Sequence, residues 1–335
     1  MNTTTLKRLS IAAGIALALS ATNAWSQDAC AHRGDLDAMF CDANKDMVAD
    51  TPTDPKKWRD PSTIVFTYTP VEDPAVYEKM FDHFTKHLAQ CTSKKVVFFQ
   101  VQSNAAQIEA MRAGRLHVGG FSTGPTGFAV NIAGAVPFAI KGGPNGPRSY
   151  NLLVISRKDN ASINTLTDLK GRKVAHTSPS SNSGHMAPNA LLPKQGLTPG
   201  TDYKILFSGK HDQSVMGVNS GDYDAATVAS DVFERMARRG TIKLEDFRVL
   251  FKSQPFPTSS FAYAHDLEPK LRDKLVGCFM NYKFTPEMVK AFDGDDHFTA
   301  ATFQKDYAVV RQVAEAGGEK FTREAFDRDA AKAKK

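Results

Sequence analysis

Residues 176–188 have the composition of an anion-binding turn. Serines, an asparagine and a glycine follow a short apolar strand predicted around Val174-Ala175, at the point where a helix should begin. Small side chains there leave backbone N–H groups uncovered, and the helix dipole adds partial positive charge. Oxyanions bind at such helix N-termini. A Ser/Asn cap on an ordinary surface helix has the same composition, so this segment alone leaves both interpretations open.

The pattern of strand, polar turn and helix recurs downstream, at residues 207–215 and 219–232. The first repeat carries His211, whose ring nitrogens can donate hydrogen bonds, and the second carries Asp231. Taken singly, each has an ordinary role as well, His211 as a helix cap and Asp231 as an acid in a first helical turn.

Five motifs in this order and spacing carry a family resemblance. They are Thr-Pro-Val-Glu-Asp-Pro (69–74), Leu-Lys-Gly-x-Lys-Val-Ala (169–175), Ser-x-Ser-Gly-x-x-x-Pro (181–188), Gly-x-His-Asp-x-Ser-Val (209–215) and Ser-x-Pro-x-Pro (253–257). From about residue 64 to about 276 the chain resembles the periplasmic phosphate-, phosphite- and phosphonate-binding proteins of ABC transporters. The resemblance implies the type II periplasmic-binding-protein fold: two α/β lobes, a ligand cleft between them and two crossing strands that join them.

The resemblance also implies the ligand-binding residues and the partner. An ABC-transporter permease in the membrane would receive a small phosphorus oxyanion (phosphonate, phosphite or phosphate), and the protein would not be an enzyme. Asp231 would accept a proton from a ligand P–OH group or from an ammonium group, because a carboxylate repels a bare dianion. The implied contacts are Tyr68, Thr69, Ser122, Thr123, Thr126, Phe128, Ser181, Asn182, Ser183, His211 and Asp231.

Two positions depart from the family pattern. Asn182 stands where the family usually has a threonine, and Phe128 stands where a phosphonate-contacting tyrosine is common. Proteins of the same build sense arsenite through a cysteine thiolate and signal to a membrane histidine kinase. An oxyanion sensor of that kind is the alternative function, although no cysteine lies in the predicted cleft segments.

The elements that would position these residues alternate between strand and helix, which predicts crossover units and largely parallel sheets. We expect strands at 64–68, 95–101 and 116–119 and helices at 74–90 and 104–113. About 300 mature residues favour two lobes. The protein is expected to act as a monomer. The predicted boundaries are an N-terminal extension at 27–60, a first lobe at 61–153 and 255–335, and a second lobe at 154–254.

Residues 1–26 have the features of a secretory signal peptide that is cleaved after export to the periplasm. Lys7 and Arg8 precede an apolar run that is too short to span a membrane, and small residues follow it. Cleavage would remove these two basic residues and lower the net charge from +6 to +4. This charge suits an anion-binding cleft, and no motif or basic run indicates nucleic-acid binding.

Four cysteines in an exported chain predict two disulfides, and the preferred pairing is Cys30–Cys41 and Cys91–Cys278. No cofactor is expected, although Asp42, Asn44, Asp46 and Asp50 follow the spacing of a calcium loop. The glycine and glutamate of such a loop are missing, so an acidic turn is the default interpretation.

A remote alternative is a serine hydrolase. Residues 120–124 match the Gly-x-Ser-x-Gly nucleophile elbow around Ser122. In a hydrolase, Asp231 and the polar turn at residues 181–183, which we call the cradle, would have no role.

Overall fold

The computed structural model describes residues 30–332, so the predicted signal peptide lies outside the described residues. Of these, residues 31–332 belong to one compact unit, to which the description below refers. Within residues 30–332, no helix is both long and apolar enough to cross a membrane.

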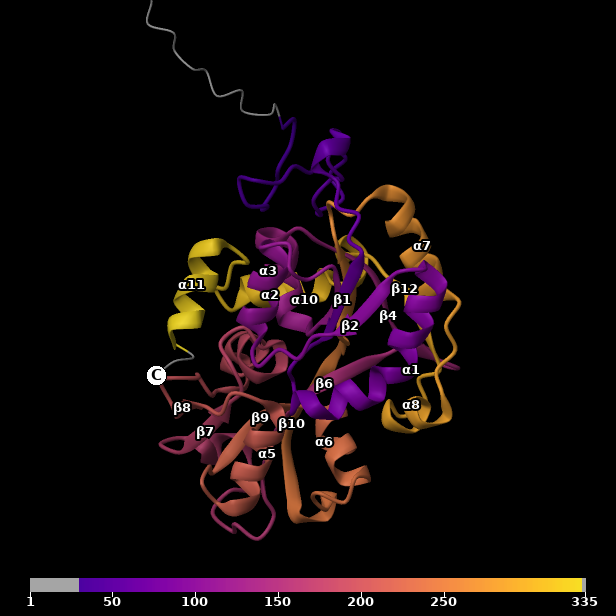
Figure 1. Ribbon diagram of the computed structural model, residues 1–335. Coiled ribbons are helices and arrows are strands. Elements are labelled where there is room, and N and C mark those ends of the chain that lie inside the picture. The colour runs from indigo at the N-terminus through magenta and orange to yellow at the C-terminus, as the bar shows by residue number, and fades with distance from the viewer. Residues whose placement is uncertain (1–29, 333–335) are drawn as a thin grey trace, which may run out of the picture. The chain divides into compact units, whose positions relative to one another are not determined.

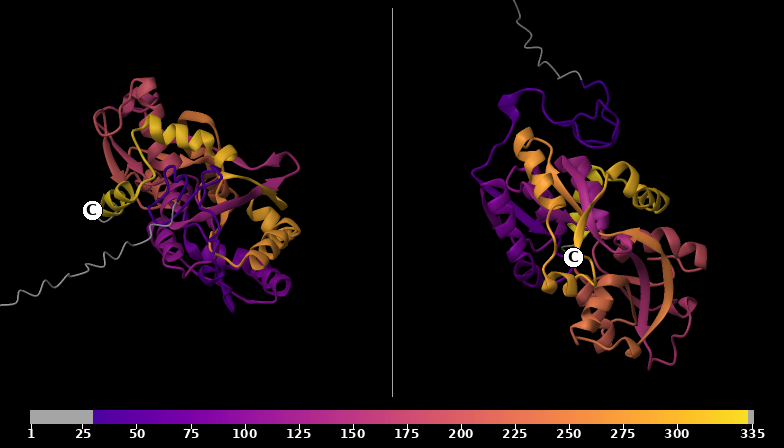
Figure 2. Two further views of the ribbon diagram at one scale, coloured as in Figure 1. Left: turned by 90° about the horizontal axis from the view of Figure 1, so that it is seen from above. Right: turned by 90° about the vertical axis from the view of Figure 1, so that its right-hand side faces the viewer.

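The strands of the described residues form two sheets, which lie at opposite ends of this unit (Figure 1; Figure 2, right). In the first sheet, β1 runs parallel to β2 and β3, whereas β11 and β12 pair antiparallel. The strand order is β12 (His297–Ala300), β4 (Ala135–Gly143), β11 (Ser260–Ala264), β3 (Val118–Phe121), β1 (Thr63–Tyr68) and β2 (Lys95–Phe98), with the short β5 (Gly146–Pro147) beside β4.

The second sheet is antiparallel on one side and parallel on the other. Strand β7 pairs parallel with β8 and β9, and β6 pairs antiparallel with β9 and β10. The order is β10 (Phe247–Pro257), β6 (Ser149–Arg157), β9 (Ala225–Ala229), β7 (Lys173–His176) and β8 (Lys204–Phe207). The predicted α/β fold with two lobes is confirmed, and we call the sheets with their helices the first and second lobe.

Helices surround both sheets. The first lobe contains α1 (Pro74–Thr92), α2 (Asn104–Arg112), α3 (Thr123–Ala133), α7 (Pro269–Met280), α8 (Pro286–Ala291) and α9 (Phe303–Asp306). The second lobe contains a π-helical turn η3 (Asn182–Met186), α4 (Ala187–Leu191), α5 (His211–Ser220) and α6 (Ser230–Arg238). At the C-terminal end lie α10 (Ala308–Ala316) and α11 (Arg323–Lys332), and the 3-10 turns are η1 (Pro55–Lys57), η2 (Leu166–Leu169), η4 (Pro193–Gln195) and η5 (Leu244–Asp246).

The C-terminal helices do more than cover the first lobe. Helix α10 contacts α3 and also packs against α4 and η3, which belong to the second lobe. The chain passes between the lobes twice, just before β6 and between β10 and β11, and the β6–β10 pair begins at Ser149 and Pro257. These two passages flank the space between the sheets.

The first lobe is built on an aromatic core. Phe66 on β1 makes edge contacts with Phe81 and Phe84 of α1 and with Phe279 of α7, and all four side chains are buried. The Cys91–Cys278 disulfide joins α1 to α7 in the same layer, as the sequence predicts. Cys30 and Cys41 are disulfide-bonded as well. The first lobe therefore has a covalent link beneath a densely packed sheet.

The N-terminal extension contains the acidic turn considered for calcium. Asp42 is buried, and its two carboxylate oxygens accept hydrogen bonds from the backbone N–H groups of Asp46 and Met47. Asp50 accepts one from the N–H of Ala43, and Asn44 one from that of Asp46. Within residues 30–332, no three His, Cys, Asp or Glu side chains are placed to hold a metal ion.

Candidate ligand-binding site

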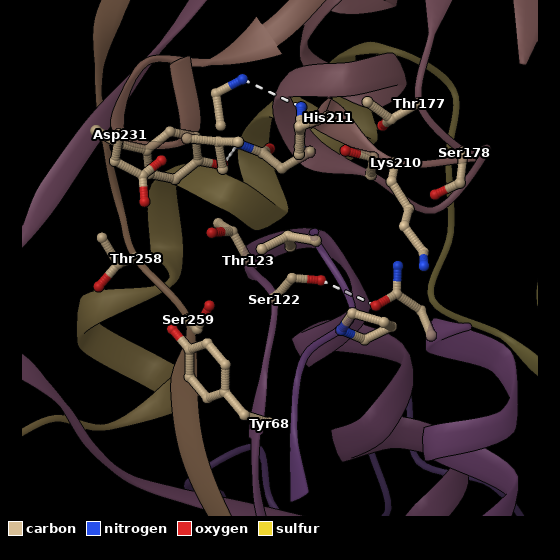
Figure 3. Close-up of a pocket in the computed structure, with 18 of the residues that line it drawn as sticks. Tyr68, Ser122, Thr123, Thr177, Ser178, Lys210, His211, Asp231, Thr258 and Ser259 are labelled. Atoms are coloured by element: carbon tan, nitrogen blue, oxygen red, sulfur yellow. Dashed lines mark hydrogen bonds between the residues drawn. The ribbon is translucent and has the colours of Figure 1, made fainter. Parts of the chain in front are cut away.

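A small cavity lies between the two lobes, at the carboxyl ends of parallel strands from both sheets (Figure 3). This is where α/β proteins place ligands, because loops and helix N-termini converge there. The space open to the centre of a water molecule is about 40 Å³. Since roughly 10–15 Å³ holds one water, the cavity has room for about three waters or one small tetrahedral anion.

Hydroxyl groups dominate the wall from the first lobe. Tyr68 ends β1, and Ser122 and Thr123 follow β3 at the start of α3. The hydroxyl of Ser122 donates to the amide oxygen of Asn104 at 3.2 Å, and that of Thr123 donates to the carbonyl of Pro257 at 2.9 Å. The hydroxyls are thus held in place by neighbours on other elements.

Part of the wall from the second lobe is formed by Thr177, Ser178, Ser181 and Asn182, which follow β7. The hydroxyl oxygen of Ser181 caps η3 by accepting from the N–H of Gly184 at 3.1 Å. The amide nitrogen of Asn182 donates to the hydroxyl oxygen of Tyr150 at 3.0 Å. Tyr150 lies near the start of β6, so the cradle is tied to one of the passages between the lobes.

Several buried polar atoms around this cavity lack a hydrogen-bond partner within the described residues. They are the hydroxyl oxygens of Thr177 and Thr258 and the amide oxygen of Asn182, and all three residues line the cavity. A buried polar group without a partner costs about 1–3 kcal/mol. Two hydroxyls in this state can donate to an incoming anion, which would recover that cost.

His211 is a neutral hydrogen-bond donor. Its Nδ1 accepts the N–H of Ala229 at 3.2 Å, so the ring proton is on Nε2. Burial lowers the pKa of His211 to about 4, although Asp231 and Glu72 oppose this shift. At neutral pH the ring is therefore uncharged and Nε2–H is available to a ligand oxygen.

Asp231 lies beside Arg235, a second-lobe residue that also forms an ion pair with the first lobe. A carboxylate oxygen of Asp231 is 3.7 Å from Nη1 of Arg235 on the same helix. The Nε of Arg235 also donates at 2.7 Å to Glu72, a buried residue between β1 and α1 in the first lobe. Arg239 pairs with the other oxygen of Glu72. The hydroxyl of Tyr77 donates at 2.8 Å to Oε2 of Glu72, the oxygen that Arg235 contacts. We call Glu72, Arg235 and Arg239 the interlobe ion cluster.

Gly124 allows the lobes to approach each other here. A Cβ on Gly124 would lie 2.3 Å from the carbonyl oxygen of Ser180 and 2.7 Å from the backbone nitrogen of Asn182. Both atoms are backbone atoms of the opposite lobe, so no side-chain rotation could relieve the overlap. The second glycine of the Gly-x-Ser-x-Gly match thus has a packing role between the lobes.

The structure brings together seven of the eleven predicted ligand contacts. The residues that line the cavity are Tyr68, Ser122, Thr123, Ser181, Asn182, His211 and Asp231. The other four have different surroundings.

Of these four, Thr126 is buried within α3 and contacts Ser260, and Phe128 packs against Phe321 and Phe326. Thr69 and Ser183 are buried next to cavity residues without lining the cavity themselves. The side chain of Phe128 therefore does not stand in for a missing ligand hydroxyl.

Sequence reasoning missed several lining residues. Thr258 and Ser259 directly follow the Ser-x-Pro-x-Pro motif, and Lys210 precedes His211, so a signal was present for all three. Asn104 and Tyr150 carry no such signal, because only the packing of α2 and β6 brings them to the cavity.

The surroundings of Ser122 and of the cysteines bear on the two alternative functions, a serine hydrolase and an arsenite-type sensor. Ser122 donates to an amide oxygen, which is not a base that could activate a nucleophile. All four cysteines are disulfide-bonded, so none offers the thiolate that arsenite sensing requires.

Comparisons with known proteins point to one family. A family model described as "ABC transporter, phosphonate, periplasmic substrate-binding protein" matches residues 66–307. The phosphate-import protein PhnD of Mycolicibacterium smegmatis is 31% identical over 234 residues, which are 65% of this chain and 71% of that protein. The phosphonates-binding periplasmic protein of Escherichia coli is 25% identical over 208 residues, 61% of each chain. The match therefore spans less than two thirds of the second relative.

A solved structure shares the fold. PhnD1 of Prochlorococcus marinus, determined in complex with methylphosphonate, superposes with a TM-score of 0.69 at 19% identity. The superposition covers 78% of this chain and 100% of that one.

Proposed function

We propose that this chain, which belongs to the family of periplasmic substrate-binding proteins of phosphonate ABC transporters, captures a small phosphorus oxyanion and delivers it to a membrane permease. The observation that carries the proposal is the cavity between the lobes, which is small and lined by hydroxyl donors and a neutral histidine. A tetrahedral anion with three or four oxygens matches this size and this set of donors.

Neutral hydrogen-bond donors line the cavity together with the charged side chains of Lys210, Asp231 and Arg235. The free donors are the O–H groups of Tyr68, Thr258 and Thr177 and the Nε2–H of His211 (Figure 3). The hydroxyl protons of Ser122 and Thr123 are already donated within the protein. Hydrogen bonds to an anion are about twice as strong as neutral ones. Several of them in a space that excludes bulk water can hold the anion, and the basic residues Lys210 and Arg235 line the cavity as well.

The ligands of the relatives fall in the same chemical class. One relative is named for phosphate import, another for phosphonate binding, and the structural relative holds methylphosphonate. We propose that this chain binds a ligand of that class, with Tyr68, Ser122, Thr123, Ser181, Asn182, His211 and Asp231 as its contacts.

Capture would proceed by closure of one lobe on the other. We propose residues 61–153 and 255–335 as the first lobe and 154–254 as the second, with the hinge at the two passages near Ser149 and Pro257. The interlobe ion cluster would form as the lobes close, because Glu72 and Arg235 belong to opposite lobes. We further propose that residues 1–26 direct export to the periplasm, where the mature protein acts as a monomer.

Titration calorimetry of the mature protein, unfolded and refolded to remove carried-over ligand, tests this function. The panel is phosphate, phosphite, methylphosphonate, ethylphosphonate, 2-aminoethylphosphonate and sulfate. We expect tight binding of at least one phosphorus ligand and no response to sulfate. Silence across all phosphorus ligands would refute the proposal.

A further inference from the structure

Behind the first-lobe wall lies a buried lysine. Lys141 on β4 is 4% exposed, which is rare for a lysine. Its ammonium nitrogen donates to the hydroxyl oxygen of Tyr68 at 2.8 Å. It also lies 4.7 Å from the ring centroid of Phe292 and 5.4 Å from that of Tyr68. The rings of Phe292 and Tyr68 and the hydroxyl of Tyr68 therefore surround most of this charge.

The ammonium has no ion-pair partner within residues 30–332, because no carboxylate oxygen there lies within 4.0 Å of it. Asp295 is the acidic group near enough to interact with it electrostatically, but the pair that Asp295 forms is with Arg148, at 3.9 Å. An isolated buried charge costs several kcal/mol unless another charge or hydrogen bonds compensate it. A negative charge delivered from outside the chain would supply that compensation.

Tyr68 connects the ammonium to the cavity. Its hydroxyl oxygen accepts from Lys141, so its own O–H can donate to a second acceptor, and the side chain lines the cavity beside Ser259 (Figure 3). Gly120 leaves space for this ring, since a Cβ there would lie 2.4 Å from a Tyr68 ring carbon.

We propose that Lys141 is the counter-charge of the bound anion, that it acts through the hydroxyl of Tyr68, and that it excludes phosphonates that carry an ammonium group. The ligand class is then the phosphorus oxyanion without a cationic substituent: phosphate, phosphite or a simple alkylphosphonate. This inference rests on the proposed function and makes its substrate class narrower.

The charges on the opposite wall do not offset Lys141. Asp231 could attract an ammonium group, but Arg235 stands 3.7 Å from it. Arg235 and Arg239 together face Glu72 and Asp231, so two positive charges meet two negative ones. Lys210 also lines the cavity. The balance around the ligand is therefore positive, and an ammonium group would be repelled.

The test compares ethylphosphonate with 2-aminoethylphosphonate, which differ only in the terminal ammonium group. By calorimetric titration, the wild-type protein should bind ethylphosphonate about tenfold more tightly or better, as expected for a unit charge at close range. If 2-aminoethylphosphonate binds as tightly as ethylphosphonate or more tightly, the inference is wrong, and this measurement needs no variant.

The variant Lys141→Met assigns the preference to Lys141. Its affinity for ethylphosphonate should fall by about tenfold or more, and the ratio between the two ligands should move toward one. Lys170→Met is the matched control, because the Lys170 side chain is 56% exposed beside Asp202, and both affinities should stay unchanged there. A purely structural role of Lys141 would weaken both ligands equally and leave the ratio intact, which would overturn the inference.

The variant Tyr68→Phe tests whether Lys141 acts on the ligand through the hydroxyl of Tyr68. It keeps the charge and removes the hydroxyl, so it should weaken both ligands while the ratio persists. Combined with Lys141→Met, the two losses should fall short of additive, because both changes interrupt one interaction. Fully additive losses would show that Lys141 does not act through Tyr68. If the wild type binds no phosphorus ligand at all, the proposed function fails instead, and the two failures are thereby distinguished.

Discussion

The two walls of the cavity differ in how their charges are balanced. On the first-lobe wall, hydroxyls face the cavity and one buried ammonium, that of Lys141, stands behind them without an ion pair in the described residues. On the second-lobe wall, Asp231 and Arg235 compensate each other, and Arg235 is paired again with Glu72. The first wall thus supplies attraction for an anion, whereas the second supplies selection by protonation state.

The lobes behind these walls differ as well. The first has a large aromatic core and the Cys91–Cys278 disulfide. The second contains a buried chain of neutral polar side chains, in which His176 lies 2.8 Å from both His185 and the hydroxyl of Tyr203. We infer that the first lobe is the rigid partner and that acid acts mainly on the second.

The largest effect is expected from breaking the interlobe ion cluster with Glu72→Gln. The substitution leaves Arg235, 6% exposed, without its buried carboxylate partner. Removing one partner of a buried ion pair costs about 3–5 kcal/mol. If the cluster forms on closure, ligand affinity should fall by about 100-fold or more, measured by calorimetric titration.

Tyr77→Phe is the control for this experiment. It removes one hydrogen bond to Glu72 but no charge, so the expected loss is about 1 kcal/mol. Unchanged affinity in Glu72→Gln, with a loss in unfolding free energy only, would show that the cluster is equally formed in the open and closed states.

The second effect is acid destabilisation through the second lobe. Burial lowers the pKa of His185 and of His211 to about 4, from the usual value of 6.5, and lowers the pKa of His176 as well. Between pH 6.5 and 4 the unfolded chain binds protons that the folded chain does not. Stability is therefore complete above about pH 6.5 and falls by up to about 1.4 kcal/mol per pH unit for each histidine as the pH drops.

Urea unfolding at pH 7.5, 6 and 5 measures this loss. Hydrogen exchange at pH 5 should show faster opening in β7, β8 and η3 than in β1 and β3, because the histidines whose pKa values are lowered most lie in the second lobe. Burial also lowers the pKa of His117 and His265 in the first lobe, but by less. Equal acceleration in both lobes would contradict the comparison. His185→Gln should flatten part of the pH profile.

Much of the fold could be predicted from sequence because periodicity and turn residues are local signals. The predicted strand at 64–68 and helices at 74–90 and 104–113 agree with β1, α1 and α2 to within a few residues. The contact of α10 with the second lobe was not predicted, since helix amphipathicity shows that a face is buried but not against what.

The residues that line the cavity were found from sequence where they lie at or just after the end of a strand, as Tyr68, Ser122 and Asp231 do. Lys141 was missed because a lysine in the middle of an apolar strand reads as an exposed position. Phe128 was assigned from the family pattern, and it does not line the cavity in this structure because its ring packs against Phe321.

Phe128→Tyr tests whether the side chain at position 128 contacts the ligand. If Phe128 occupied a ligand position, restoring a hydroxyl would tighten binding. Since the ring is fully buried against Phe321 and Phe326, we expect unchanged ligand affinity and a loss of about 1–3 kcal/mol in unfolding free energy, from burying a hydroxyl without a partner. Urea unfolding and calorimetry on one preparation measure both. A gain in affinity would show that the cavity reaches α3 more deeply than this structure indicates.

The smallest effect is expected from Asp231→Asn, and it tests whether the second wall selects protonated ligands. Arg235 compensates the carboxylate in part, so its loss should cost about 1 kcal/mol of binding free energy for a ligand with a P–OH group. A fully deprotonated ligand should lose nothing or gain, because a repulsion disappears. Calorimetric titrations at pH 5.5 and 8 separate the two. Asp212→Asn is the matched control, since Asp212 is likewise the second residue of its helix but does not line the cavity. If both variants change the pH dependence alike, the selection comes from overall charge, and the two walls would then differ only in the attraction that Lys141 supplies.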